Sequence, residues 1–177
     1  MIAFSDRVEK YVPAKKGIGH VLRIVRDCLA LDAVGVKTNF LPALDFAGHV
    51  LRRRSIVFLV SDFAGGAGRE REVAQLARRH DVIAVRLMPP ELSLGVDPAA
   101  RGLVRLRGLE NGHEVLRDFS SRAVRERYQE SVRAWDTELR ASLRRARVDR
   151  IDVPTHGPIA EPILGFFRKR ERRASHG

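Results

Sequence analysis

The chain has 177 residues, of which 44% are hydrophobic, and a formal net charge of +11. These values suit one domain with a sizeable core and exclude a disordered chain, and no apolar run approaches the roughly 20 residues of a transmembrane helix. A single cysteine, Cys28, excludes an internal disulfide, and with no signal peptide in view it predicts a cytoplasmic protein that does not contact membranes.

The N-terminal part predicts a short hairpin followed by a helix. Residues 1–4 have the character of a strand, residues 5–7 turn the chain, and residues 9–12 form the return strand, which Pro13 stops. Apolar residues then recur at three- and four-residue spacing over 18–29. This spacing predicts an amphipathic helix.

The next segment predicts a helix and a buried strand. Thr38 and Asn39 are good capping residues for a helix over 40–51. Ile56–Val60 is an unbroken apolar run that ends at Ser61 and Asp62. Such a run is typical of a strand whose two faces are both covered by helices in a parallel sheet, where ligands bind at the carboxyl ends of the strands.

The remaining elements alternate between the two types. A glycine-rich loop at 65–68 precedes a helix over 70–80, a strand over 81–87 and a loop over 91–101. Two hairpin arms, 103–106 and 113–116, flank the turn signal Asn111-Gly112. A long helix capped by Ser120 or Ser121, a strand over 151–153 and a helix over 159–167 follow. The alternation predicts an α/β three-layer sandwich with a mostly parallel sheet.

Two residues with oxygen atoms in their side chains are candidate metal ligands. The hydroxyl of Thr38 and the carboxylate of Asp62 could supply part of an octahedral Mg²⁺ shell. The spacing by itself favours the alternative that Thr38 is only a helix cap and Asp62 only a turn residue. No G-x-S-x-G serine and no H-x-x-x-H zinc motif is present, so the residues predict neither a hydrolase serine nor a zinc site.

The positive charge points to an acidic partner, such as nucleic acid or an acidic protein. A bland alternative is that arginine simply solvates the surface. The basic run near the C-terminus could bind phosphate or an acidic partner, or be a solvated end. Its cations are Arg168, Lys169, Arg170, Arg172 and Arg173.

The motifs together resemble the von Willebrand factor A-like part of the bacterial domain-of-unknown-function family 58. The segments that carry the resemblance are residues 4–9, 13–17, 20–23, 58–63, 76–82, 102–106, 120–128 and 166–168. Met88-Pro89, Phe119 and Thr155-His156 depart from the family's usual residues.

The resemblance implies a function that the residues alone do not give. Members are similar to A-domains with a metal-ion-dependent adhesion site, are commonly encoded beside MoxR-type AAA+ ATPases, and are not known as enzymes. Thr38 and Asp62 match the threonine and the later aspartate of that site. Its first element, D-x-S-x-S, is absent from the sequence. Mg²⁺ is therefore implied for intact relatives, and weak metal binding or none is expected here.

The resemblance also implies that an N-terminal strand and helix of the A-like domain are not encoded in this chain. We expect an incomplete von Willebrand A-like domain over 1–167 and a basic tail over 168–177. The expected role is a non-enzymatic protein-interaction domain that acts with a MoxR-type ATPase or its client in complex assembly or maturation. An accessory nucleic-acid-binding protein and a truncated gene product without independent function are the alternatives.

Overall fold

The computed structural model describes residues 1–35, 37–64, 70–90, 102–108 and 112–175. The chain divides into two compact units, Met1–Arg54 with Gly108–His113 and Ser55–Arg107 with Glu114–Gly177. The predicted loops at 65–68 and 91–101, and Asn111 of the predicted turn, lie outside the described residues.

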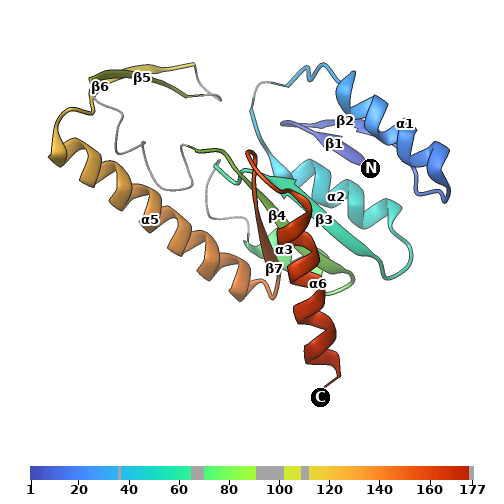
Figure 1. Ribbon diagram of the computed structural model, residues 1–177. Coiled ribbons are helices and arrows are strands. Elements are labelled where there is room, and N and C mark those ends of the chain that lie inside the picture. The colour runs from blue at the N-terminus through green and yellow to red at the C-terminus, as the bar shows by residue number, and fades with distance from the viewer. Residues whose placement is uncertain (36, 65–69, 91–101, 109–111, 176–177) are drawn as a thin grey trace. The chain divides into compact units, whose positions relative to one another are not determined.

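The first unit contains an antiparallel hairpin and two helices (Figure 1). Its elements are β1 (Ile2–Phe4), β2 (Val8–Tyr11), α1 (Ile18–Leu29) and α2 (Phe40–Val50). Helix α2 packs on the hairpin, where the rings of Phe4 and Phe40 lie 5.3 Å apart between centroids. All four predicted elements of this region are confirmed.

Helix α2 is capped by only one of the two residues that the sequence offered. Asn39 is the N-cap, and its Oδ1 accepts a hydrogen bond of 3.2 Å from the backbone N–H of Leu41. Thr38 precedes the cap and is half-buried. The buried side of α2 consists of Phe40, Ala43, Leu44 and Ala47.

The second unit is built on a parallel sheet with the strand order β3–β4–β7. These strands are β3 (Ile56–Ser61), β4 (Asp81–Met88) and β7 (Asp149–Pro154). The helices of its described residues are α3 (Glu70–Ala77), α5 (Arg122–Arg145) and α6 (Ala160–Ala174), and an antiparallel hairpin consists of β5 (Leu103–Arg107) and β6 (Glu114–Asp118).

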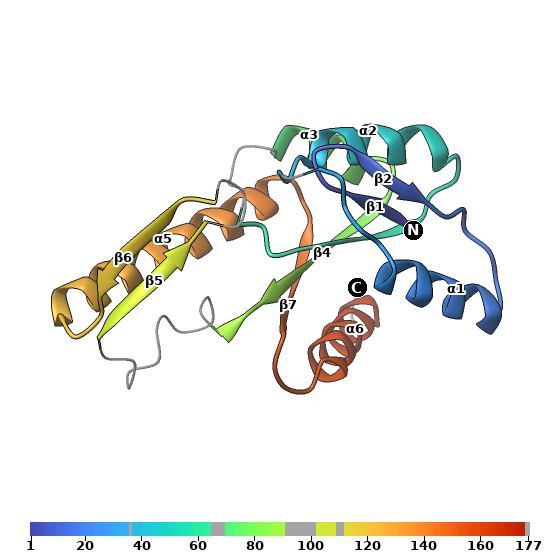
Figure 2. The same cartoon turned by 90° about the horizontal axis from the view of Figure 1, so that it is seen from above.

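Helices cover both faces of this sheet (Figure 2). Helix α6 packs on the face formed by Ile83, Val85, Ile151 and Val153, against which Ile163, Phe166 and Phe167 are placed. Helices α3 and α5 contact each other, and they contact β4 and β7 respectively. The fold is therefore mixed α/β with a three-stranded parallel sheet. No helix of the described residues is both long enough and apolar enough to cross a membrane.

The prediction that both faces of β3 are buried is wrong. Only Leu59 is buried, whereas Ile56, Phe58 and Val60 are 57%, 48% and 50% exposed. The register places Phe58 beside Ile83 and Val60 beside Val85, so the exposed residues extend the apolar face that α6 covers. Because β3 is an outer strand of the described sheet, α6 reaches its neighbours more fully than it reaches β3.

The last helix is longer than the apolar pattern suggested. The prediction ended the helix at residue 167, but α6 continues through the basic run to Ala174. The cations of this run are therefore displayed at helical spacing, on more than one face of α6.

Candidate functional site

Asp62 lies in a tight turn at the carboxyl end of β3. The hydroxyl of Ser61 accepts a hydrogen bond of 3.1 Å from the N–H of Phe63, and Oδ1 of Asp62 accepts one of 3.0 Å from the N–H of Ala64. Phe63 has a φ of 58°, which is rare for a bulky side chain and costs on the order of 1–2 kcal/mol. Its ring is buried, and this burial holds the turn in place.

The geometry of this turn leaves part of Asp62 available. Hydrogen bonds of the turn engage Oδ1, and within the described chain Oδ2 accepts none. The side chain is half-buried. Asp62 therefore acts as a turn residue and still presents one carboxylate oxygen at the carboxyl end of the sheet.

Thr38 belongs to a group of loops at one end of the first unit. The N–H of its neighbour Asn39 donates a hydrogen bond of 2.8 Å to the carbonyl of Ser5. Glu9 accepts hydrogen bonds from the hydroxyl of Ser5 and, at 2.9 Å, from the N–H of Gly35. These donors, the Ser5 hydroxyl first, outweigh desolvation and lower the pKa of Glu9.

Only glycine fits at position 35 of this group of loops, because there is no space for a side chain. A Cβ atom at this position would lie 2.1 Å from Oγ of Ser5 and 2.5 Å from Oδ1 of Asp6. The contact between Gly35 and Glu9 joins segments that are 26 residues apart, so no local pattern in the sequence predicted it.

The predicted pair of metal ligands is divided between the two units, Thr38 in the first and Asp62 in the second. Each lies in a loop next to the end of a regular element, as the sequence predicted. Among the described residues, no group of three or more His, Cys, Asp and Glu side chains could hold a metal ion. The pairing of Thr38 with Asp62 stays a prediction.

The cations of the basic run have different surroundings on α6. Arg170 makes a two-pronged contact with Asp81, at 2.7 and 2.8 Å, and donates from Nε to Asp149 at 3.0 Å. Lys169 and Arg173, one turn apart, line an open hollow between α6 and β7. Arg168 is exposed and is not among the residues that line the hollow.

A buried network of charges lies on the opposite face of the sheet. Arg86 of β4 is 2% exposed, contacts Asp136 of α5 and stacks over the ring of Trp135 at 4.4 Å. Arg150 of β7 binds the same Asp136 at 2.8 Å and Asp152 at 2.7 Å. No motif in the sequence predicted this network, and the mixture of charged and apolar residues in 149–153 was its only local signal.

Large apolar side chains are exposed on α1. The stripe at positions 18, 22, 25 and 29 is on one side of the helix, but Ile18, Leu22 and Leu29 are 74%, 61% and 84% exposed. The only buried residue of α1 is Asp27, which is paired with Lys10, Arg23 and Arg26. Helix α1 is thus held to its unit by a charged side chain, while its apolar stripe faces outward.

The chain is similar to a protein family and to mycobacterial proteins. A family model described as "Protein of unknown function DUF58" matches residues 1–138. An uncharacterized protein of Mycobacterium bovis is 27% identical over 169 residues, which are 94% of this chain and 52% of the relative. An uncharacterized protein of Mycobacterium avium is 26% identical over 169 residues, 94% of this chain and 97% of the relative. The chain thus spans about half the length of the Mycobacterium bovis relative.

One solved structure is similar over much of the chain. It is the crystal structure of an uncharacterized membrane spanning protein from Vibrio fischeri, which is 16% identical in sequence to this chain. The match covers 86% of this chain and 64% of the Vibrio fischeri chain, and its TM-score is 0.23. At this TM-score the similarity supports no conclusion. The family match covers far more than half of the sequence, and the chain therefore belongs to the DUF58 family of proteins of unknown function.

Proposed function

We propose that the chain is a non-enzymatic protein-interaction domain whose partner is a MoxR-type AAA+ ATPase or the client of that ATPase. The observation that carries this proposal is the exposed apolar stripe of α1. A helix of a soluble protein ordinarily buries such a stripe, and contiguous exposed apolar surface marks an interaction site. Helices with this pattern commonly dock into apolar grooves of partner proteins.

The exposed side of β3 supports the same role. Ile56, Phe58 and Val60 continue an apolar face, and β3 is hydrogen-bonded to one neighbour, β4, in the described sheet. An open strand edge with apolar side chains is a template for another strand. The proposal is that the sheet is von Willebrand A-like and that a further strand and helix cover β3 when the domain acts.

The partner is tested by measuring binding of the full chain to a purified MoxR-type AAA+ ATPase, with isothermal titration calorimetry. Leu22→Gln should weaken binding at least tenfold, because it removes apolar surface from the stripe of α1. Leu164→Gln is the matched control, since Leu164 is a comparably exposed leucine on a different helix. Equal effects of the two variants, or no binding of the unaltered chain, would contradict the proposal.

The metal site of the family is proposed to be incomplete in this chain. The hydroxyl of Thr38 and the free carboxylate oxygen of Asp62 are hard ligands of the kind that Mg²⁺ prefers. In a relative with D-x-S-x-S, the metal would link the domain to an acidic side chain of the partner. This chain lacks that element, so calorimetry with Mg²⁺ or Mn²⁺ should show no tighter than millimolar binding. A micromolar site that Asp62→Ala abolishes would refute this part of the proposal.

A further inference from the structure

The outer edge of β7 and helix α6 enclose an open hollow of about 380 Å³. Residues 149–152 of the strand form one wall, and Phe166, Lys169 and Arg173 of the helix contribute to the other. Strand β7 pairs with β4 on one side, and no described strand pairs with its other side. The hollow therefore borders a row of backbone donors and acceptors that a strand could use.

The unpaired charge of this hollow is positive. Its two carboxylates are already engaged, Asp149 by Arg170 and Asp152 by Arg150. Lys169 and Arg173 are exposed, and neither has an ion pair within the described chain. Arg150 also lines the hollow; it is 10% exposed, and its Nη1 has no hydrogen-bond partner among the described residues.

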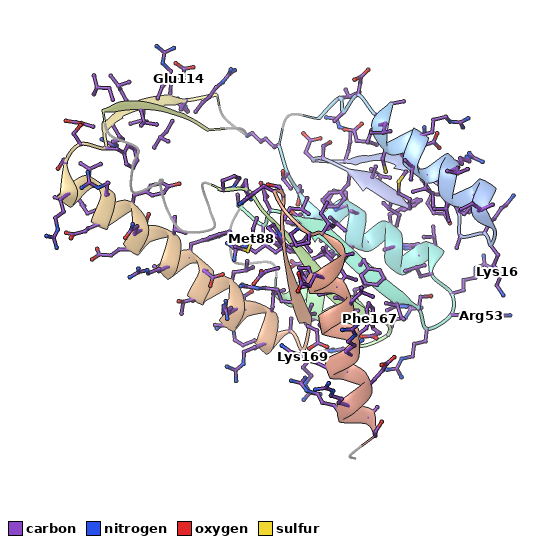
Figure 3. All side chains as sticks on the ribbon, in the orientation of Figure 1. Lys16, Arg53, Met88, Glu114, Phe167 and Lys169 are labelled. Carbon is purple, nitrogen blue, oxygen red and sulfur yellow. The ribbon has the colours of Figure 1, made fainter. Side chains whose placement is uncertain are left out.

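The spacing of the two free cations fits an extended ligand. Residues four apart on a helix are separated by about 6 Å along its axis, and alternate residues of a strand by about 6.6 Å. Helix α6 runs back alongside β7, and Figure 3 shows Lys169 and Phe167 on this helix. A strand added to β7 would thus place every second side chain on the α6 face, at the spacing of Lys169 and Arg173.

We propose that this hollow binds an extended acidic segment of a protein partner, which adds to the edge of β7 as a strand. Two acidic side chains at alternate positions of the segment pair with Lys169 and Arg173. Main-chain hydrogen bonds supply affinity and the two ion pairs supply selectivity, as in other complexes formed by strand addition. This inference rests on the proposed role in protein interaction and names the chemistry of the partner.

Binding of a synthetic 12-residue peptide, with valine or threonine alternating with glutamate, tests the proposal by fluorescence anisotropy with the full chain. The double variant K169E/R173E should weaken binding at least tenfold. R168E/R172E is the matched control, because it makes the same change of charge on the same helix outside the hollow, and it should weaken binding less than threefold. Circular dichroism should show both variants folded, and K169Q/R173Q replaces the first double variant if it does not fold.

Two further probes separate strand addition from charge attraction. A peptide of the same sequence that is methylated at every backbone nitrogen should not bind, because it has no N–H group to donate to the strand edge. A single-stranded oligonucleotide of equal charge should compete poorly. Binding of the N-methylated peptide, equal competition by the oligonucleotide, or equal losses in the two double variants would overturn the proposal.

The same variants distinguish peptide binding in the hollow from the proposed binding of a MoxR-type ATPase. If K169E/R173E binds the MoxR-type ATPase as the unaltered chain does and has also kept its affinity for the peptide, the role of the hollow fails and the role in protein interaction stands. If the unaltered chain binds the peptide in the hollow and does not bind the ATPase, the proposed partner fails and the hollow stands.

Discussion

Two titratable residues of the second unit, His80 and Asp136, make its stability depend on pH. His80 is buried at the end of α3, and neither ring nitrogen has a hydrogen-bond partner among the described residues. Desolvation, followed by the charge of Arg79, lowers the pKa of His80 below its ordinary value of 6.5. Protonation therefore opposes folding at this position.

The free energy of unfolding should fall as the pH is lowered through 6.5 toward the folded-state pKa of His80, because the unfolded chain then takes up a proton that the folded chain resists. His80→Leu should flatten this part of the pH profile, measured by urea denaturation between pH 7.5 and 5.5. An unchanged profile would show that other groups titrate there. His49, which is not buried, provides the control as His49→Leu.

Asp136 holds two arginines of the sheet at once. Desolvation raises its pKa, but hydrogen bonding and charge from Arg150, and then from Arg140, outweigh burial and lower the pKa below 3.8. The ionised form thus contributes stability that is fully present above pH 3.8 and is lost as the pH falls through the folded-state value.

Asp136→Asn should cost about 3 kcal/mol at pH 7, because it removes the nearer carboxylate from the buried Arg86 and leaves only that of Asp152, 3.8 Å away. The free energy of unfolding from urea denaturation measures the loss. Glu138→Gln on the same helix removes only an exposed ion pair with Arg145 and should cost less than about 1 kcal/mol. A cost for Asp136→Asn as small as that of the control would mean that the network adds no net stability.

At the scale of elements, the sequence was sufficient wherever a pattern is local. Alternation and helical spacing placed the helices and strands of both units, because each depends on residues a few positions apart. The exposure of α1 and β3 was not predictable in this way. Whether an apolar stripe is covered depends on distant segments, and here the residues that would cover Leu22 or Val60 are not their neighbours in the sequence.

The candidate site, too, was predictable only where its features depend on residues that are close in the sequence. The positions of Thr38 and Asp62 at the ends of elements follow from local signals, as does the basic character of α6. The partners of Arg170 do not, since Asp81 is 89 residues away in the chain. The turn at Phe63, with its positive φ, also had no signal, because a glycine would ordinarily be expected there.

Arg170 anchors α6 to the sheet. Its hydrogen bonds with Asp81, and then its contacts with Asp149, outweigh burial and raise the pKa of Arg170 above the ordinary arginine value. Arg170→Gln should lower the free energy of unfolding by about 1–2 kcal/mol, since the pairs are charge-assisted and partly screened by solvent. Arg168→Gln, on the exposed side of the helix, should change it little. Similar losses for both variants, in urea titrations, would contradict an anchoring role.

The molecule as a whole combines a net charge of +11 with exposed apolar residues on α1 and β3. Like charges repel over about 10 Å at 0.1 M salt but only about 3 Å at 1 M, while apolar association does not weaken with salt. The mean mass from light scattering should therefore rise between 0.1 and 1 M NaCl. Leu22→Gln with Val60→Thr should reduce this rise; an equal rise with and without these substitutions would point to another surface.

Arg170 also bears on the order in which the second unit can assemble during synthesis. The two carboxylates that Arg170 contacts belong to Asp81 and Asp149, the first residues of β4 and β7. Arg170 can therefore contact both only after these strands are paired. Until residues up to 170 have left the ribosome, helix α6 cannot cover the apolar face formed by Ile83, Val85, Ile151 and Val153. At translation rates of about 5–20 residues per second, this apolar face is exposed to water for seconds, during which chaperones can bind it.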